Sequence, residues 1–219
     1  MDPGLARTEL LAALPEALRP LAARAPWRRY RKGTLLIQEG DLGDTLYIIL
    51  SGQLRAFSAA DNGREITYGL YGPGEYLGEM SLAGGPRSAS VETCCASSCA
   101  VVSRRTLAEH LAEHPDFAFE LLTKVIRRAR AATISARQLA LNDVYGRLRH
   151  LLDSLAGPAD AAGVRSLGER FTHQQLSQRL GCSREMVSRL LKDLERGGYL
   201  QQTAAAPAWQ LLRPLPARW

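Results

Sequence analysis

The sequence lacks several features that would place it in common classes of protein. It has no run of about 18 consecutive apolar residues, so a membrane span is not expected. The amino terminus, Met1-Asp2-Pro3-Gly4, lacks the basic stretch followed by an apolar stretch that marks a secretory signal. There are only 4 cysteines, and disulfides are not expected in a chain without an export signal. We therefore expect a cytoplasmic protein with no membrane partner.

Patterns typical of catalysis and metal binding are also missing. No nucleophile, base and orienting group form a recognisable set, and no spacing resembles that of metal ligands. Cys94, Cys95 and Cys99 lie close together, which allows a redox interpretation, but they fall in a predicted strand region where small side chains pack well. The histidines lie outside the predicted strands: His110, His114, His150 and His173. We expect neither an enzyme nor a metal or haem protein.

The composition is that of a globular protein of one large or two small domains. Of its 219 residues, 46% are hydrophobic and 23% are charged. The formal net charge of +6 permits an anionic partner without proving one. The basic residues are mostly arginine, and the lysines are Lys32, Lys124 and Lys192.

The pattern along the chain divides it into four segments. Residues 1–26 are expected to be a short helical segment. Residues 27–115 contain short β-rich runs closed by glycine, which is typical of a β sandwich or barrel; the runs are 34–37, 45–50, 53–57 and 66–68. Residues 116–142 are expected to form one long helix, and residues 143–219 a further domain.

The long helix carries a stripe in near-heptad steps. Its members are Phe117, Leu121, Val125, Arg128, Ala132, Ser135 and Leu139. Two interpretations remain open from the spacing: the stripe packs on its own domain, or it forms the seam of a dimer.

The last segment has the capping and turn residues that are typical of a winged helix-turn-helix. A break is expected at Asn142-Asp143, with Asp143 capping a helix that runs to about Leu155. Residues 157–168 are expected to be a loop or a short hairpin. Thr172 and Gln175 form a capping box that opens a helix over 174–180, Gly181 permits a tight turn, and Ser183 caps a helix to about Arg196. Residues 199–209 are expected to form a small β wing.

One face of this second helix has the residues of a DNA reader. Arg184, Glu185, Ser188 and Arg189 share one face near its start. Arginine donates to guanine O6 and N7, and glutamate accepts from cytosine N4, so the face suits the major groove. Lys192 and Arg179 are expected to contact phosphates. The alternative to DNA reading is that these residues form an ordinary solvated face. The succession of two capped helices around a glycine turn favours DNA reading over it.

Two motifs together carry a family resemblance. The run from Gly74 to Ser90, with Gly78-Glu79 ahead of Arg87-Ser88, resembles the phosphate-binding cassette of cyclic-nucleotide-binding domains. The stretch from Thr172 to Lys192 resembles the helix-turn-helix of the CRP/FNR family of bacterial transcription regulators, and the likeness extends from about Trp27 to Leu212. The resemblance implies an α+β fold: an N-terminal cyclic-nucleotide-binding β-roll (a jelly roll), a long dimerisation helix and a C-terminal winged helix-turn-helix.

The resemblance also implies an effector site. Arg87 and Ser88 would bind a cyclic phosphate, Glu79 the ribose 2′-OH, and backbone N–H groups after Gly78 would add a positive dipole end. The other residues implied are Met80, Arg128, Ala132 and Thr133, and Ala132 cannot hydrogen-bond to a base through its side chain. Because the base contacts are altered, the identity of the nucleotide stays open: cAMP is favoured, and cGMP and cyclic di-GMP are the alternatives. A ligand-independent or redox-controlled regulator, in which Glu79 and Arg87 form a structural ion pair, is the alternative.

For DNA, the resemblance assigns base reading to Arg184, Glu185 and Arg189. It implies a homodimer on an inverted repeat of TGTGA-like half-sites, with RNA polymerase as a further partner. Ser188 would shift the site toward TTGAT-like sequence, and Met186 stands where the family has a phosphate-contacting threonine. The rest of the expected DNA interface is Thr172, Gln174, Ser183 and Lys192.

Overall fold

The structure, a computed structural model, describes residues 3–61, 65–141, 143–202 and 208–219. The chain divides into two compact units, which are described separately. The first comprises residues 1–58 and 67–131, and the second comprises residues 59–66 and 132–219. Among the described residues no helix is both long and apolar enough to span a membrane.

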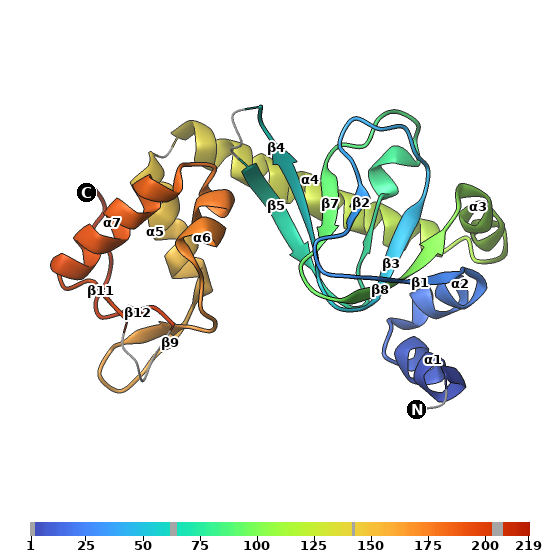
Figure 1. Ribbon diagram of the computed structural model, residues 1–219, viewed down its shortest axis with the longest axis horizontal. Coiled ribbons are helices and arrows are strands. Elements are labelled where there is room, and N and C mark those ends of the chain that lie inside the picture. Colours follow the sequence, from blue (N-terminus) through green and yellow to red (C-terminus); the bar gives the residue numbers. More distant parts are fainter. Residues whose placement is uncertain (1–2, 62–64, 142, 203–207) are drawn as a thin grey trace. The chain divides into compact units, whose positions relative to one another are not determined.

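Two four-stranded sheets build the first unit (Figure 1). One has the order β1-β8-β3-β6 and the other the order β2-β7-β4-β5. The bounds are β1 Trp27–Tyr30, β2 Leu35–Ile37, β3 Leu46–Ser51, β4 Leu54–Ala59, β5 Glu65–Tyr71, β6 Tyr76–Leu77, β7 Ser90–Thr93 and β8 Ser97–Val102. The four β-rich runs of the sequence coincide with β2 to β5, which confirms those expectations.

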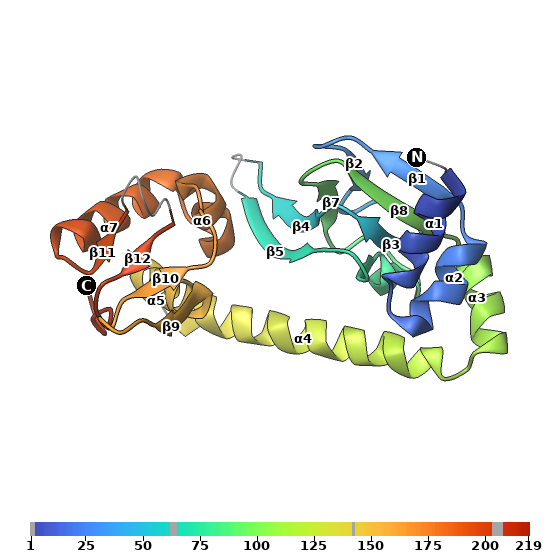
Figure 2. The ribbon, with the colours of Figure 1, turned by 90° about the horizontal axis from the view of Figure 1, so that it is seen from below.

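Strand β3 is apolar on both faces because both are covered. Ile49 lies in the core between the two sheets, together with Leu54 and Val91. The alternate residues Leu46 and Ile48 lie in a second core, formed with helices that cover the other face of the sheet. These helices are α1 Pro3–Ala12, the 3₁₀ helix η1 Glu16–Leu18, α2 Arg19–Arg24 and α3 Arg104–Glu113. Figure 2 shows α1, α2 and α3 together at one end of the sheets.

Helix α4 (Phe117–Leu141) uses the predicted stripe to pack on its own unit. Phe117 is buried in the helix-covered core, Leu121 packs against that core, and Arg128 hydrogen-bonds to the Tyr76 carbonyl. The beginning of the stripe therefore packs on its own unit, whereas Val125, Ala132 and Ser135 are exposed, and the dimer seam stays a prediction for them. The side chain of Leu139 lies outside the described residues. The exposed large apolar residues of α4 are instead Phe119, Leu122, Val125, Ile126 and Ile134, and Val125 alone belongs to the predicted stripe.

The second unit contains helices and a small antiparallel sheet of order β11-β12-β10-β9. Its elements are α5 Val144–Leu155, β9 Ala156–Ala159, β10 Arg165–Leu167, α6 His173–Leu180, α7 Arg184–Arg196, β11 Leu200–Gln201 and β12 Gln210–Leu211. Asp143 caps α5, as expected, by accepting a 2.7 Å hydrogen bond from the Gly146 N–H, while Asn142 lies outside the described residues. β9 and β10 form the hairpin alternative for 157–168, and β11 pairs with β12 as the expected wing.

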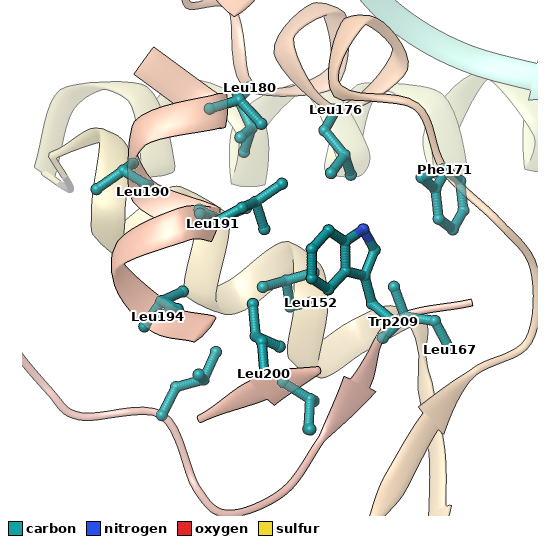
Figure 3. Close-up of a cluster of buried hydrophobic side chains, with 14 of the residues drawn as sticks. Leu152, Leu167, Phe171, Leu176, Leu180, Leu190, Leu191, Leu194, Leu200 and Trp209 are labelled. Carbon is teal, nitrogen blue, oxygen red and sulfur yellow. The ribbon is translucent and has the colours of Figure 1, made fainter. Parts of the chain in front are cut away.

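One apolar core holds the second unit together (Figure 3). Leu152 of α5, Leu176 of α6 and Leu191 of α7 meet around Trp209, next to the wing. Burying a leucine side chain stabilises a fold by roughly 1.5–3 kcal/mol. The core therefore fixes α6 and α7 to each other and leaves the opposite face of α7 in solvent.

Candidate functional site

A glycine turn forms the base of the predicted effector pocket. Gly78 has φ of +98° and precedes the 3₁₀ helix η2, Glu79–Ser81. A Cβ atom at Gly78 would lie 2.4 Å from the Thr45 carbonyl oxygen, so no other residue fits there without a shift of the backbone. The helix expected after Gly78 is present, but it is a single 3₁₀ turn.

Arg87 is a buried cation held by neutral groups. Its side chain donates from Nη1 to the Gly78 carbonyl at 3.0 Å and to Ser81 Oγ at 2.7 Å, and from Nη2 to the Thr45 carbonyl at 3.0 Å. Arg87 is only 8% exposed. These acceptors carry no net charge, and among the described residues the guanidinium has no ion-pair partner, which suits an anionic ligand.

Glu79 pairs with the long helix rather than with Arg87. Its carboxylate is 5% exposed and forms an ion pair with Arg128 Nη1 from α4. The alternative prediction of a structural ion pair between Glu79 and Arg87 is therefore wrong, because the cation that pairs with Glu79 is Arg128. Within the described part of the chain, Glu79 Oε2 is buried and has no hydrogen-bond partner. A buried acceptor of this kind fits a ligand hydroxyl.

Two cations attach α4 to the sheet beside this pocket. Arg128 Nη2 donates to the Tyr76 carbonyl at 2.6 Å, and its guanidinium lies 4.8 Å from the centre of the Tyr71 ring. One turn earlier, Lys124 Nζ is 3.0 Å from Glu75 Oε1. Burial, followed by the charge of Glu79, raises the pKa of Tyr76 to about 12. Lys124 and Glu75 were missed from the sequence, although Lys124 stands four residues before Arg128, on the same face of a helix.

The remaining predicted effector residues are exposed. Ser88 Oγ donates to Met80 Sδ at 3.4 Å, and both side chains lie in solvent. Ala132 and Thr133 are exposed on α4 and belong to the second compact unit. The first unit thus brings together Gly78, Glu79, Arg87 and Arg128, and does not itself contain the predicted base contacts.

The cysteines Cys94, Cys95 and Cys99 were all predicted to lie in a strand region, and the structure confirms this for Cys99 alone. Cys99 lies buried in β8, where burial raises the pKa of its thiol to about 12. Cys94 and Cys95 instead lie in the turn between β7 and β8, and all of these cysteines are free thiols. No group of three or more His, Cys, Asp or Glu side chains in the described ranges could hold a metal ion.

The caps of the helix-turn-helix form as the sequence predicted. Thr172 Oγ accepts from the Gln175 N–H at 3.2 Å, and Gln175 Oε1 accepts from the Thr172 N–H at 2.8 Å. Ser183 Oγ accepts from the Met186 N–H at 3.2 Å, and Gly181 makes the turn with φ of +62°. These local bonds fix where α6 and α7 begin.

The predicted reader face is accessible. Arg184, Glu185, Arg189 and Lys192 are exposed on α7, and Ser188 is half-buried. A hydrogen bond from its own backbone N–H, and then one from the Ser183 hydroxyl, lower the pKa of Glu185, so it carries an ionised acceptor at neutral pH. Thr172, Gln174 and Ser183 are exposed at the helix starts.

Arg179 is not placed as predicted. Its guanidinium lies 4.6 Å from the centre of the Phe171 ring, and burial lowers its pKa. It stacks on an aromatic ring rather than standing free toward a phosphate.

A basic cleft adjoins the reader face. It has a volume of about 400 Å³ and lies between the starts of α6 and α7 and the wing. Arg170, Thr172, His173 and Arg184 line it, together with Trp209. His173 Nδ1 lies 2.7 Å from Ser188 Oγ, a contact that the sequence did not indicate.

Comparisons with known proteins match both units. Residues 27–114 match the cyclic nucleotide-binding domain, and residues 146–212 match the Crp-like helix-turn-helix domain. The CRP-like cAMP-activated global transcriptional regulator of Mycobacterium tuberculosis is 30% identical over 206 residues, which is 92% of each chain. The cAMP-activated global transcriptional regulator CRP of Salmonella typhimurium is 31% identical over 170 residues, 76% of this chain and 81% of that protein.

Solved structures agree with the fold. The c-di-GMP responsive global regulator CLP of Xanthomonas campestris is 27% identical, with a TM-score of 0.77 over 90% of this chain and 98% of that one. CprK, at 15% identity, reaches a TM-score of 0.74 over 91% of each chain and supports the fold alone. The predicted family and fold class are confirmed. The chain belongs to the CRP/FNR family of transcriptional regulators, which join a cyclic nucleotide-binding domain to a helix-turn-helix and are not enzymes.

Proposed function

We propose that this regulator binds a cyclic nucleotide, with cAMP favoured, in the pocket formed by Gly78, Glu79 and Arg87, and that binding controls recognition of DNA by α7. The observation that carries the proposal is the buried Arg87 guanidinium, whose recorded acceptors are all neutral. A cyclic phosphate carries one negative charge and would pair with it. The proposed division is 1–26, 27–115, 116–142 and 143–219, and the proposed place of action is the cytoplasm.

The contacts of Glu79 suggest how binding would reach the long helix. A ribose hydroxyl could donate to the unpartnered Oε2 while Oε1 remains beside Arg128. The ligand would then share a carboxylate with α4 and change how strongly Arg128 holds it. Such a ligand shifts the conformational equilibrium only if its affinity differs between the two states.

The identity of the base in the cyclic nucleotide is the part of the proposal that the residues leave open. Two relatives at 30% and 31% identity are named as cAMP-activated, whereas the structure at 27% identity is named as responsive to c-di-GMP. Ala132 lacks a side chain able to hydrogen-bond with a base, and Thr133 retains a hydroxyl. cAMP is favoured on the nearer relatives, with cGMP and cyclic di-GMP as the ligands to compare. Met80 and Ser88 complete the proposed site at its exposed side.

We propose a homodimer formed through the exposed face of α4. Phe119, Leu122 and Ile126 are exposed at steps of three and four residues, which is the spacing of a coiled-coil seam. Two copies would present two reader helices to successive major grooves, about 34 Å apart, on an inverted repeat. Arg184 and Arg189 would read guanine and Glu185 cytosine in TGTGA-like half-sites, and RNA polymerase would be the further partner.

Phosphate contacts would surround these bases. Thr172, Gln174, Ser183 and Lys192 are exposed at the helix starts and along α7, where they would fix the register on DNA without reading sequence.

Calorimetric titration of the full chain with cAMP, cGMP and cyclic di-GMP tests the proposal. We expect saturable binding of cAMP near one per subunit, and loss of binding in Arg87→Ala. Arg105→Ala is the matched control, because Arg105 is exposed on α3 and, within the described part of the chain, pairs with Glu109 one turn away. Retained binding in Arg87→Ala would refute the site. No binding of any nucleotide by the wild type would favour a ligand-independent regulator.

A further inference from the structure

A histidine on one helix of the helix-turn-helix holds a reader residue on the other. His173 is the first residue of α6, and Ser188 lies on α7, one turn after Arg184. His173 Nδ1 and Ser188 Oγ are 2.7 Å apart. The imidazole also stacks on Trp209, with ring centres 6.5 Å apart and an interplanar angle of 27°. The ring is half-buried and held on two sides, so it fixes the position of the hydroxyl.

The direction of this hydrogen bond decides what Ser188 can read. A serine hydroxyl is both donor and acceptor, and within a helix it often turns back to the carbonyl four residues earlier. A hydroxyl that donates its proton to Nδ1 is left with its oxygen lone pairs and can only accept. In the major groove the available donors are adenine N6 and cytosine N4, whereas guanine and thymine offer acceptors there.

We propose that the Ser188 hydroxyl donates to His173 Nδ1, and that His173 thereby determines specificity by leaving Ser188 as an acceptor for the amino group of an adenine or a cytosine. This inference rests on the proposed reading of DNA by α7. His173 is a positioning residue, because it acts through Ser188 and need not touch a base.

The surroundings of His173 also present a competing role. The cleft beside it is lined by Arg170 and Arg184, and it could receive a DNA phosphate. A histidine that binds phosphate would add affinity for every sequence equally, whereas one that orients Ser188 would act at a single base pair. The two roles therefore predict different binding profiles.

The experiment compares binding profiles across a set of duplexes. The wild-type full chain, with and without cAMP, is used to select an operator from randomised duplex DNA. Affinities are then measured by fluorescence anisotropy for that operator, for variants changed at each base pair of a half-site, and for random duplex. The proteins are wild type, His173→Phe, His173→Asn, Ser188→Ala and the His173→Phe/Ser188→Ala double variant.

His173→Phe keeps a ring to stack on Trp209 and removes the nitrogen that contacts Ser188. We expect it to lower discrimination at one base pair by about two- to tenfold, the range of a single hydrogen bond. Ser188→Ala should act at the same position, and the double variant should lose no more than either single variant. His173→Asn, which can place an amide near the site of Nδ1, should restore part of the preference. Gln174→Ala is the control, and it should change affinity uniformly.

Several outcomes would overturn the proposal. An equal loss in His173→Phe on the operator and on random duplex, with a shallower salt dependence, would make His173 a phosphate contact. An unchanged profile in His173→Phe, an effect at a different base pair from the one sensitive to Ser188→Ala, or an effect of Ser188→Ala that persists when the exocyclic amino group at that base pair is removed, would also overturn it. A wild type that selects no sequence would instead refute the proposed function itself. Thermal unfolding of each variant confirms that it folds, and His173→Leu, which also lacks the ring nitrogen, serves as the test if His173→Phe does not fold.

Discussion

At the scale of single residues, the effector pocket depends on two buried charges with different partners. Arg87 is satisfied by carbonyls and a hydroxyl, while Glu79 is neutralised by Arg128. Burial of an unneutralised charge is unfavourable unless a binding partner later compensates it. The residue that is poorly compensated in the isolated chain is therefore the one best suited to an anion.

The Glu79–Arg128 pair should show strong coupling in a double-mutant cycle. Arg128→Gln alone leaves Glu79 buried without its cation, and breaking a buried pair in this way destabilises by about 3–5 kcal/mol. Glu79→Gln combined with Arg128→Gln should restore much of that loss. Denaturant unfolding of the four proteins measures the coupling. Additive effects would show that the pair is solvated and contributes little.

Arg189 should contribute to sequence recognition more than to general affinity. Its exposed side chain lies on the proposed reader face of α7. Arg189→Ala is expected to weaken binding to the selected operator by about 1–3 kcal/mol and to change binding to random duplex little. Lys192→Ala is the comparison, and it should weaken both. Equal losses for Arg189→Ala on the two duplexes would make Arg189 a phosphate contact only.

At the scale of elements, α4 has two apolar faces with separate roles. The face with Phe117 and Leu121 packs on the sheet unit, and the face with Phe119 and Ile126 is exposed. A near-heptad spacing identifies a stripe without saying which surface covers it. For this reason the sequence left the stripe's partner open, and the structure shows that its beginning, with Phe117 and Leu121, packs on the sheet unit.

The exposed face of α4 predicts a dimer that one charge would weaken. Ile126→Glu places a carboxylate in the proposed seam, so we expect a shift toward monomer in sedimentation velocity. Arg127→Glu is the matched control, because it lies about 100° further round the helix. An unchanged dimer in Ile126→Glu would exclude this face as the seam. Phe119, at 72% exposure, offers a second position for the same test.

Helix α3 carries a buried histidine that should make stability depend on pH. His110 is 1% exposed, and neither of its ring nitrogens has a hydrogen-bond partner among the described residues. Burial, then the charges of His114 and Arg24, lower its pKa from the ordinary 6.5, while Glu113 opposes this. Because the unfolded chain takes up the proton first, stability should be present above about pH 6.5 and should decrease as the pH falls below it.

Thermal unfolding at about pH 7.5 and about pH 5.5 checks the role of His110. The wild type should lose more stability on acidification than His110→Leu, which has no group to protonate. His150→Gln, at an exposed site on α5, should behave as the wild type does. Equal pH dependence in wild type and His110→Leu would show that another group controls it.

How far the sequence predicted these elements depended on the range of the interactions. The caps at Asp143, Thr172 and Ser183 join residues three apart, so a local sequence pattern predicts them. The contact between His173 and Ser188 joins residues 15 apart on two helices, and Arg128 and Tyr76 are 52 apart. No local pattern encodes such pairs, because they exist only once the cores have positioned both elements.

At the scale of the whole molecule, the effector residues Gly78, Glu79 and Arg87 all belong to the first compact unit. A ligand that binds only the folded state at about 100 times its Kd stabilises that state by about 2.7 kcal/mol. cAMP should therefore raise the unfolding temperature of the first unit, as measured by scanning calorimetry. Arg87→Ala should abolish the shift and Arg105→Ala should retain it. A shift that survives in Arg87→Ala would place the ligand elsewhere.

The turn at Gly78 also constrains how this regulator can diverge. A Cβ there would lie 2.4 Å from the Thr45 carbonyl and 2.9 Å from Arg87 Nη1, so no other residue fits at position 78 unless the backbone shifts. The turn that would hold the sugar and phosphate is constrained by main-chain atoms, such as the Thr45 carbonyl, which are present whatever the side chain. Evolution of a new effector preference is thereby directed to the exposed positions of the proposed site in the same unit, such as Met80 and Ser88, which lie in solvent.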